Sequence, residues 1–291
     1  MNIKLPLAVK ILIETIVCLV VILAIGLLGT LPTRLLKALM TEETFSQFRS
    51  SEISRLVSIA ISVFMIALHV LYSRFVQKRS LDEQGFKRNA ILPTLSGAGL
   101  GFLMIFIVVL AGMVLGVLRF EGVVHPFMVL PFFLWVLQFF VEGLREEVLC
   151  RSFFMLSLHK HAPRWLAILV NSLAFGLLHF ANPELGILPI VNLVLFGVFA
   201  SIYFFRTRNI WAVGAFHAMW NIAQGNIFGI TVSGALDELP SIFKFGMTSN
   251  TLLNGGAFGL EDGLLITLVL VVGIILVAGL KGKKPTAQEG S

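Results

Sequence analysis

Long apolar runs separated by short polar stretches cover most of the 291 residues of the chain. A helix that crosses a membrane needs about 20 mostly apolar residues, and eight segments approach that length. These segments are 8–28, 56–72, 91–118, 127–158, 165–181, 185–205, 210–229 and 264–280. The pattern predicts an all-α polytopic membrane protein, built as a bundle of about eight transmembrane helices.

The fourth apolar segment, 127–158, is too long for one upright helix, so we expect it to tilt, to bend near Pro131 or to project into the cytoplasm. The connections between segments are short and polar. We therefore expect residues 1–291 to form a single membrane domain, with 281–291 as a short cytoplasmic tail.

Composition supports the membrane assignment. Hydrophobic residues make up 57% of the chain and charged residues 13%, against about 45–50% and 25% in soluble domains. The mean hydropathy is +0.93. The net charge of +6 does not indicate nucleic-acid binding, because the basic residues lie between apolar runs. Cys18 and Cys150 both fall inside apolar segments, so we expect neither a disulfide framework nor a thiolate metal site.

The basic residues also predict the orientation, since Lys and Arg collect on the cytoplasmic side of membrane proteins. With the N-terminus inside, fifteen of the 22 Lys and Arg residues fall on the inner side and six on the outer side, and Arg145 lies within a span. Both termini are then cytoplasmic. The short chain, the short loops and the Gly-rich final loop look bacterial, which predicts the bacterial plasma membrane.

Ionisable residues inside a membrane span are costly and mark functional sites, and segment 127–158 contains the stretch VEGLREEVLCR. Glu147 and Arg151 stand four residues apart on a helix with the acid first, which is the favourable order for an ion pair. Glu142 and Arg145 can pair in a similar way. A salt-bridge network that only holds helices together is the alternative interpretation of this stretch.

Glu146 is then left without an obvious cationic partner. A carboxylate in such a desolvated position can serve as a general base. Two histidines provide further candidates. His179 lies deep in an apolar segment, and His217 and Asn221 share one face of another. Their alternative interpretations are a packing histidine and a hydrogen-bonding contact between helices.

Depth in the membrane indicates that these residues belong together. Glu146 and His179 lie fourteen and fifteen residues from the polar turn 160–164, on either side of it. At about 1.5 Å per helical residue, both lie roughly 21–23 Å from that turn, and His217 lies roughly 13 Å from the cytoplasmic end of its own segment. We expect the three side chains to approach one another if the helices pack.

Three motifs stand in order on separate apolar segments. They are Glu146-Glu147-x-x-x-Arg151, Phe175-x-x-x-His179 and His217-x-x-x-Asn221. In order and spacing they resemble the CAAX prenyl-protease and bacteriocin-processing (Abi, or CPBP) intramembrane peptidases. The resemblance runs over a motif-bearing core, 127–229. The segment 252–263, LLNGGAFGLEDG, also resembles a Gly-rich segment that precedes the last helix in bacterial members.

The resemblance implies an eight-helix bundle around a polar intramembrane cavity and an endopeptidase that acts on membrane-associated peptides. It implies that Glu146 and His179 activate the attacking water. It also implies that His217 and Asn221 stabilise the oxyanion that forms during peptide hydrolysis. Donors aimed at a developing oxyanion are what such a reaction needs.

By the same resemblance, Glu147 and Arg151 would hold the site together. The family is described both as metal-dependent and as glutamate-type. Glu146, His179 and His217 could form a zinc site with an open position, but the sequence contains no HExxH motif. We expect no obligatory metal or other cofactor, with zinc as the alternative.

The expected partners are a peptide or protein substrate in the membrane and the lipid bilayer, with no nucleic acid. The substrate would be a leader, pheromone or bacteriocin-type peptide, or a CAAX-like tail, cut at or within the cytoplasmic half of the membrane. The main alternative is a non-catalytic membrane partner, such as a bacteriocin immunity protein or a sensor-kinase scaffold. A transporter using Glu142, Glu146 and His179 is a third hypothesis, although the inverted repeats typical of transporters are not found. The oligomeric state stays open.

Overall fold

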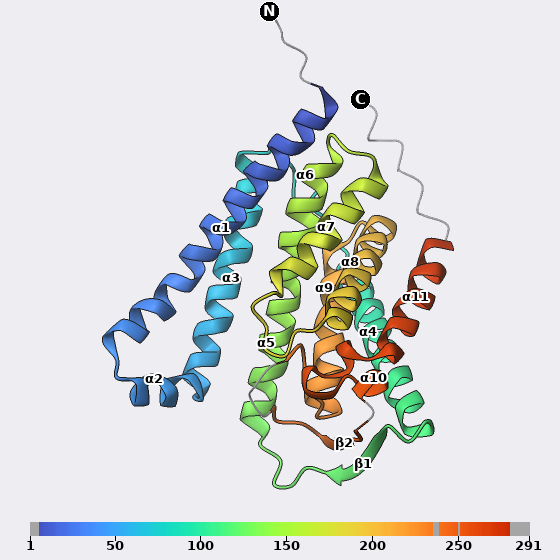
Figure 1. Cartoon of the computed structure of the whole chain (residues 1–291). Helices are drawn as coiled ribbons and strands as arrows, with labels where there is room; N and C mark the ends of the chain where they lie inside the picture. Colours follow the sequence, from blue (N-terminus) through green and yellow to red (C-terminus); the bar gives the residue numbers. More distant parts are fainter. Residues whose placement is uncertain (1–5, 235–238, 250, 280–291) are drawn as a thin grey trace, which may run out of the picture.

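The computed structural model describes residues 6–234, 239–249 and 251–279, and the predicted tail 281–291 lies outside them. Helices make up most of the described chain (Figure 1). The helices are α1 (Leu7–Leu39), α2 (Glu42–Arg49), α3 (Glu52–Phe75), α4 (Ile91–Val114), α5 (Val129–Glu147), α6 (Leu156–His159), α7 (Arg164–Leu178), α8 (Ile187–Thr207), α9 (Ile210–Ile222), α10 (Thr251–Asn254) and α11 (Leu264–Gly279).

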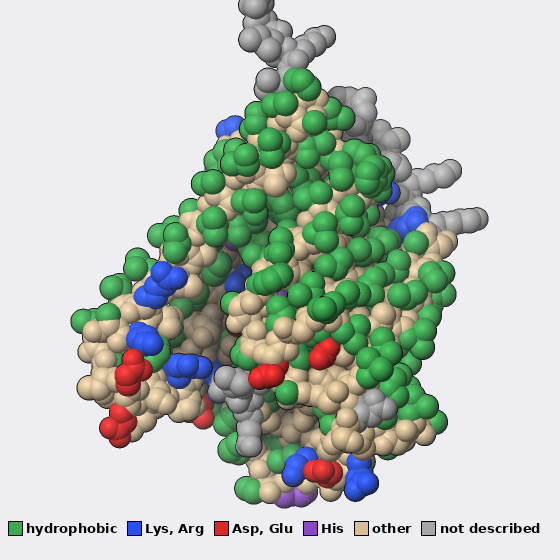
Figure 2. Space-filling view, in the orientation of Figure 1, with side chains coloured by type: hydrophobic (Ala, Val, Ile, Leu, Met, Phe, Trp, Pro, Cys, Tyr) green, Lys and Arg blue, Asp and Glu red, His purple; other side chains and the backbone are tan. Residues whose placement is uncertain are grey.

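Four of the described helices, α1, α3, α4 and α8, are long and apolar enough to cross a membrane, and α7 and α11 are shorter apolar helices. Large apolar side chains are exposed along their outer faces, which Figure 2 shows as an extensive hydrophobic surface. Soluble proteins rarely expose apolar patches of this extent, whereas lipid covers them without cost. A polytopic helical bundle therefore fits the chain, and the count of eight spans stays a prediction.

The all-α prediction misses a small antiparallel sheet of β1 (Leu118–Val123) and β2 (Phe243–Met247). The predicted helix 91–118 ends at Val114, and Gly116 turns the chain into β1 with a φ of +68°. The strands bring Phe side chains together across the pair, with the Phe120 and Phe245 ring centroids 5.5 Å apart. Aromatic cross-strand pairs of this kind stabilise a short sheet.

The long segment 127–158 does not bend near Pro131, which corrects that expectation. Helix α5 begins at Val129, so Pro131 lies in its first turn, where a backbone N–H has no helical partner to lose. The irregularity comes later, as a π-helical stretch over Val148–Met155 that leads into α6. Wide turns of this kind often occur at functional sites.

Helix α9 is the centre of the bundle, buried on nearly every side and packed between α4 and α5. Asn209 starts it by accepting a hydrogen bond from the Trp211 N–H, 2.9 Å away. A Cβ at Gly101 of α4 would lie 2.3 Å from the Phe216 carbonyl oxygen, so only glycine allows α4 to approach α9 this closely. The packing holds α9 at a fixed depth beside α5.

Helices α1 and α3 form a hairpin joined by α2, and the hairpin leans away from the rest of the bundle towards the α2 end (Figure 1). The short helix α2 was not expected from the sequence. Side-chain caps explain where α2 and α3 start. The Thr41 hydroxyl accepts a hydrogen bond from the Thr44 N–H at the start of α2, and the Ser51 hydroxyl accepts one from the Ser54 N–H at the start of α3. Both caps lie at the end of the bundle that also carries β1 and β2.

Candidate active site

The two adjacent glutamates of the first motif end α5, and one face of that helix is buried at every fourth residue: Trp135, Phe139, Gly143 and Glu147. A Cβ at Gly143 would lie 2.8 Å from the backbone nitrogen of Ala218 in α9. The glycine therefore lets α5 and α9 touch, and this contact places Glu147 beside the histidine of α9.

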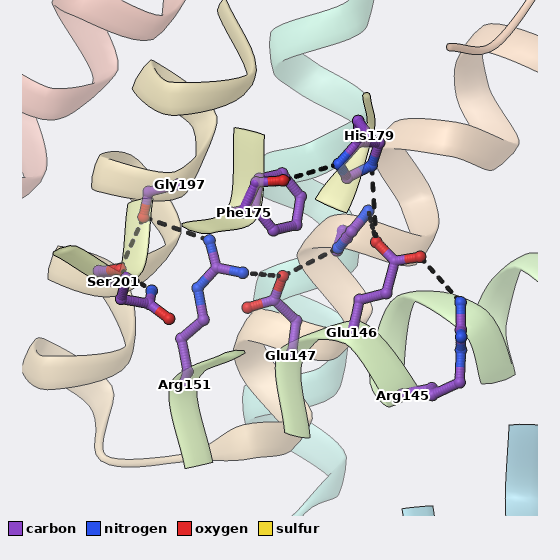
Figure 3. Close-up of polar contacts among 10 residues, drawn as sticks. Arg145, Glu146, Glu147, Arg151, Phe175, His179, Gly197 and Ser201 are labelled. Carbon is purple, nitrogen blue, oxygen red and sulfur yellow. Dashed lines mark hydrogen bonds and ion pairs between the residues drawn. The ribbon is translucent and has the colours of Figure 1, made fainter. Parts of the chain in front are cut away.

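Glu147 and Arg151 form the ion pair that their spacing predicts. Arg151 Nη1 donates to Glu147 Oε1 over 2.9 Å, and both side chains are fully buried. Arg151 Nη2 also donates to the Gly197 carbonyl of α8 at 3.2 Å, and the guanidinium lies 4.8 Å from the centre of the Phe175 ring. The pair thus connects three helices around the site (Figure 3).

His217 shares the same Glu147 oxygen, with His217 Nδ1 2.8 Å from Oε1. An ionised carboxylate only accepts hydrogen bonds, so Nδ1 carries the proton that it donates. The other ring nitrogen, Nε2, then faces Glu146, 3.8 Å from Glu146 Oε2. A carboxylate that holds one histidine nitrogen and thereby orients the other is a common supporting contact at reactive histidines.

His179 is held in the same way. Its apolar surroundings in the sequence suggested a position deep within a helix, but His179 is the residue at which α7 ends. Its Nδ1 donates to the carbonyl of Phe175 at 2.9 Å, and its Nε2 lies 4.0 Å from Glu146 Oε2 (Figure 3). A carbonyl oxygen has no proton to give, so Nδ1 again carries the hydrogen. Both histidines therefore direct Nε2 towards the same oxygen of Glu146.

Glu146 does have a cationic neighbour, which corrects the sequence-based expectation. Arg145 Nη2 donates to Glu146 Oε1 over 3.0 Å, and Arg145 does not pair with Glu142. Glu142 instead accepts a hydrogen bond from Gln138 Nε2 at 3.1 Å. The Glu146 side chain is 27% exposed, so water can reach Oε2 while Oε1 is held by Arg145.

The separations around Glu146 Oε2 suit a water molecule. Glu146 Oε2 pairs with Nε2 of His217 and with Nε2 of His179. A water oxygen about 2.8 Å from both atoms of such a pair would see them at an angle of about 85–90°. A tetrahedral zinc ion with bonds of about 2.0–2.1 Å would bring its ligands to about 3.3 Å from one another, closer than the observed 3.8 and 4.0 Å. No group of three His, Cys, Asp or Glu residues among the described residues is placed to hold a metal ion. The three candidate zinc ligands therefore do not fit the ion in this arrangement.

A cavity of about 950 Å³ contains the site. Its wall on the bundle side includes Glu142, Glu146, His179, His217 and Asn221, and the α1–α3 hairpin forms the opposite wall. The Asn221 side chain makes no hydrogen bond with any described residue, so its amide is available to a bound molecule. The structure thus brings the catalytic candidates to one cavity, with Glu147 and Arg151 buried behind them.

Glu261 is a cavity residue that the sequence reasoning missed. It accepts hydrogen bonds from the Ser233 N–H at 2.6 Å and from the Ser233 hydroxyl at 3.0 Å, and Gln224 Nε2 lies 3.4 Å away. The Asn192 side-chain amide donates to the Glu261 carbonyl at 2.8 Å. An acid inside the Gly-rich segment before the last apolar helix was the signal that could have identified it.

Comparison with known proteins finds one family model that matches part of the chain. Residues 128–223 match the family model described as type II CAAX prenyl endopeptidase Rce1-like, about a third of the chain. No curated protein and no solved structure matches the chain. The matched segment begins at the residue that precedes α5 and ends just after α9, so it contains all three motifs.

Apolar helices long enough to cross a membrane, together with glutamates and histidines that line one cavity, define the class of this protein. It is an integral membrane protein built around a polar site. Its segment 128–223 is similar to the Rce1-like family of type II CAAX prenyl endopeptidases, which is a protease family. The match confirms the family resemblance carried by the three motifs.

Proposed function

We propose that this protein is an intramembrane endopeptidase that hydrolyses peptide bonds of membrane-associated peptides. The observation that supports the proposal most is the shared contact of two histidines with Glu146. Nε2 of His217 and Nε2 of His179 lie 3.8 and 4.0 Å from the same carboxylate oxygen, and each Nδ1 is held by an acceptor. Glu146 Oε2 and the two Nε2 atoms thus surround one position that a water molecule can occupy.

In the proposed reaction, the water bound by Glu146 and His179 attacks the carbonyl carbon of the scissile bond. Glu146 Oε2 takes the proton that the water loses, and the carbonyl oxygen becomes an oxyanion. When the C–N bond breaks, Glu146 returns the proton to the leaving nitrogen, so protons and electrons balance. Arg145 keeps the carboxylate in place throughout, because it binds the other oxygen.

The oxyanion would be stabilised by the Asn221 amide and by His217. For this role the His217 ring must carry a proton on both nitrogens, and each nitrogen faces a carboxylate: Glu147 at 2.8 Å and Glu146 at 3.8 Å. Donors that are already in place cost no reorganisation when the charge develops. Substrates would be leader, pheromone or bacteriocin-type peptides, or CAAX-like tails.

The test is cleavage of a library of membrane peptides by the purified protein in lipid nanodiscs. We expect the wild type and the surface variant Glu121→Gln to cleave the same peptides at similar rates, and Glu146→Gln to cleave them at least about a hundredfold more slowly. The Gln side chain keeps an oxygen for the bond from Arg145, so folding is preserved. Because the zinc geometry does not fit, a chelator should leave cleavage unchanged.

Equal cleavage by wild type and Glu146→Gln would contradict the role of Glu146. A folded wild-type protein that cleaves no peptide of a broad library would favour a non-catalytic membrane partner. Loss of cleavage with chelator, restored by zinc, would replace the water mechanism with a metal-based one.

A further inference from the structure

The cavity occupies only one half of the bundle along its length. The α1 residues that line it run from Ile22 to Arg34, and those of α3 run from Ser58 to Met65. These are the halves of the two helices nearest to α2, and Arg49 of α2 lines the cavity as well. Figure 2 shows a hollow between the hairpin and the rest of the bundle in the lower half of the view, towards α2.

The other half of the hairpin is closed against the bundle. Cys18 of α1 and His69 of α3 are both fully buried. The His69 ring lies 5.4 Å from the ring of Phe153, and Glu14 lies 3.8 Å from His161. Apolar packing and this polar contact seal the end at which α1 starts, so the cavity opens at the α2 end.

The basic residues indicate which side of the membrane that end faces. Arg151 is buried in its ion pair and therefore carries no information about orientation. Of the other basic residues that the structure describes, apart from Arg145 within the span, ten lie at the end where α1 starts and six at the α2 end. The six are Arg34, Lys37, Arg49, Arg55, Arg119 and Lys244. The end with the excess of Lys and Arg is cytoplasmic by the positive-inside rule. The cavity therefore opens away from the cytoplasm.

The two walls of the cavity carry different charges, and the one arginine that the described residues contribute to the bundle side, Arg145, is paired with Glu146. The carboxylates of the cavity, Glu142, Glu146 and Glu261, all lie on the bundle side. The hairpin side carries Arg34 and Arg49, which are exposed and form no ion pair or side-chain hydrogen bond with the described residues. Guanidinium groups bind carboxylates through paired hydrogen bonds, so two exposed arginines on this wall can bind an anionic group.

We propose that the cavity receives its peptide from the non-cytoplasmic side of the membrane, and that Arg34 and Arg49 bind an acidic group of that peptide. This inference rests on the proposed function, and it names the substrate class as acidic peptides presented at the outer surface. It reverses the cytoplasmic access expected from the sequence. The acidic group binds the hairpin wall while the scissile bond lies against Glu146 on the opposite wall.

The side of access is tested by cysteine labelling in intact cells, which needs no catalysis. Cys18 and Cys150 are buried, so they give little background. A membrane-impermeant maleimide should label Thr33→Cys and Ser58→Cys, both in the cavity wall, without permeabilisation. Lys160→Cys, in the turn at the opposite end, should be labelled only after permeabilisation. The reverse pattern, or labelling of all three only after permeabilisation, would overturn the proposal.

Peptide recognition is tested by binding in the Glu146→Gln background, so that cleavage does not consume the probe. The probes are two fluorescent apolar peptides of about 20 residues, identical except for one Glu or Gln near the carboxyl end, in phosphatidylcholine nanodiscs. The double change Arg34→Gln/Arg49→Gln should weaken binding of the Glu peptide by about tenfold or more and leave the Gln peptide unchanged. Lys37→Gln should alter neither, because Lys37 pairs with Glu42 at 3.7 Å.

Equal weakening for both peptides would overturn recognition of the acidic group. An effect that appears only when anionic lipid is added would assign the arginines to lipid headgroups instead. The proposed function fails separately, through absence of cleavage by the wild type, while labelling and binding report on access and recognition.

Discussion

The buried pair of Glu147 and Arg151 allows a quantitative prediction. In Arg151→Met the methionine occupies similar space, but the Glu147 carboxylate stays buried with one remaining partner, His217. The Gly197 carbonyl also loses its donor from Arg151. A charge left alone in a dry interior cannot recover its hydration, so the protein should be strongly destabilised.

The magnitude follows from the burial of both partners. Their exposed fractions are 0% and their closest atoms are 2.9 Å apart. Breaking such a pair by removing one partner costs about 3–5 kcal/mol, a change of more than a hundredfold in the folding equilibrium. Glu147→Gln should cost a similar amount, because it leaves Arg151 charged. The double variant Glu147→Gln/Arg151→Met leaves no buried charge and should cost no more than either single change.

The assay is reversible unfolding in mixed micelles, run as a double-mutant cycle over these four proteins. Arg145→Met is the control on the same helix, because its pair with Glu146 is also close, at 3.0 Å, but the two side chains are 24% and 27% exposed. A partly exposed pair contributes about 1 kcal/mol or less. Additive single effects, or an Arg151→Met variant no less stable than Arg145→Met, would refute the reasoning.

Two further predictions concern helix packing and a loop outside the membrane. Gly143→Ala should destabilise the protein by about 1–3 kcal/mol in the same unfolding assay, because its Cβ would lie 2.8 Å from the backbone of Ala218, whereas Gly99→Ala, with nothing within 4 Å, should be tolerated. The Ser80 N–H and hydroxyl hold the pKa of Glu83 below its usual value. Since this pKa is lower in the folded state, the ionised carboxylate stabilises the loop above the unfolded pKa of about 4.3, and the benefit is lost as pH falls through the folded pKa. Hydrogen exchange should therefore show a less protected loop in Glu83→Gln than in wild type at pH near 7 and no difference at strongly acidic pH, while equal protection at both would contradict the assignment.

The parts of the site that depend on helix geometry were predictable from the sequence. Glu147 and Arg151 are four residues apart, and the structure pairs them as that spacing predicts. The matched depths of Glu146 and His179, and the expected approach of His217 to them, likewise agree with the position of all three on one cavity. Regular helices have one rise and one turn per residue, so spacing alone carries this information.

The pairing of Arg145 was not predictable in the same way. Adjacent residues on a helix do not normally face each other, yet Arg145 binds Glu146 because both side chains extend into the same cavity. The position of Glu261 depends on contacts between distant segments, among them Ser233 and Asn192. Such tertiary contacts leave no periodic pattern in a single sequence.

The opening of the cavity at the α2 end was also outside the reach of the sequence. It depends on how the α1–α3 hairpin leans from the bundle, which is a matter of packing (Figure 1). The sequence does contain the residues that close the opposite end, such as Cys18 and His69, but both are buried by partners from distant segments of the chain. The π-helical stretch Val148–Met155 has no sequence signature that we recognise.

The most direct test of the central claim compares two carboxylates on one helix. Glu146 and Glu142 both line the cavity, one turn apart, but only Glu146 faces the two histidines. On a peptide that the wild type cleaves, Glu146→Gln should lower kcat by about 10²- to 10⁴-fold, the usual contribution of a general base, and Glu142→Gln should lower it far less. Equal losses in the two variants, or full activity in Glu146→Gln, would contradict the assignment of Glu146 as the residue that activates water.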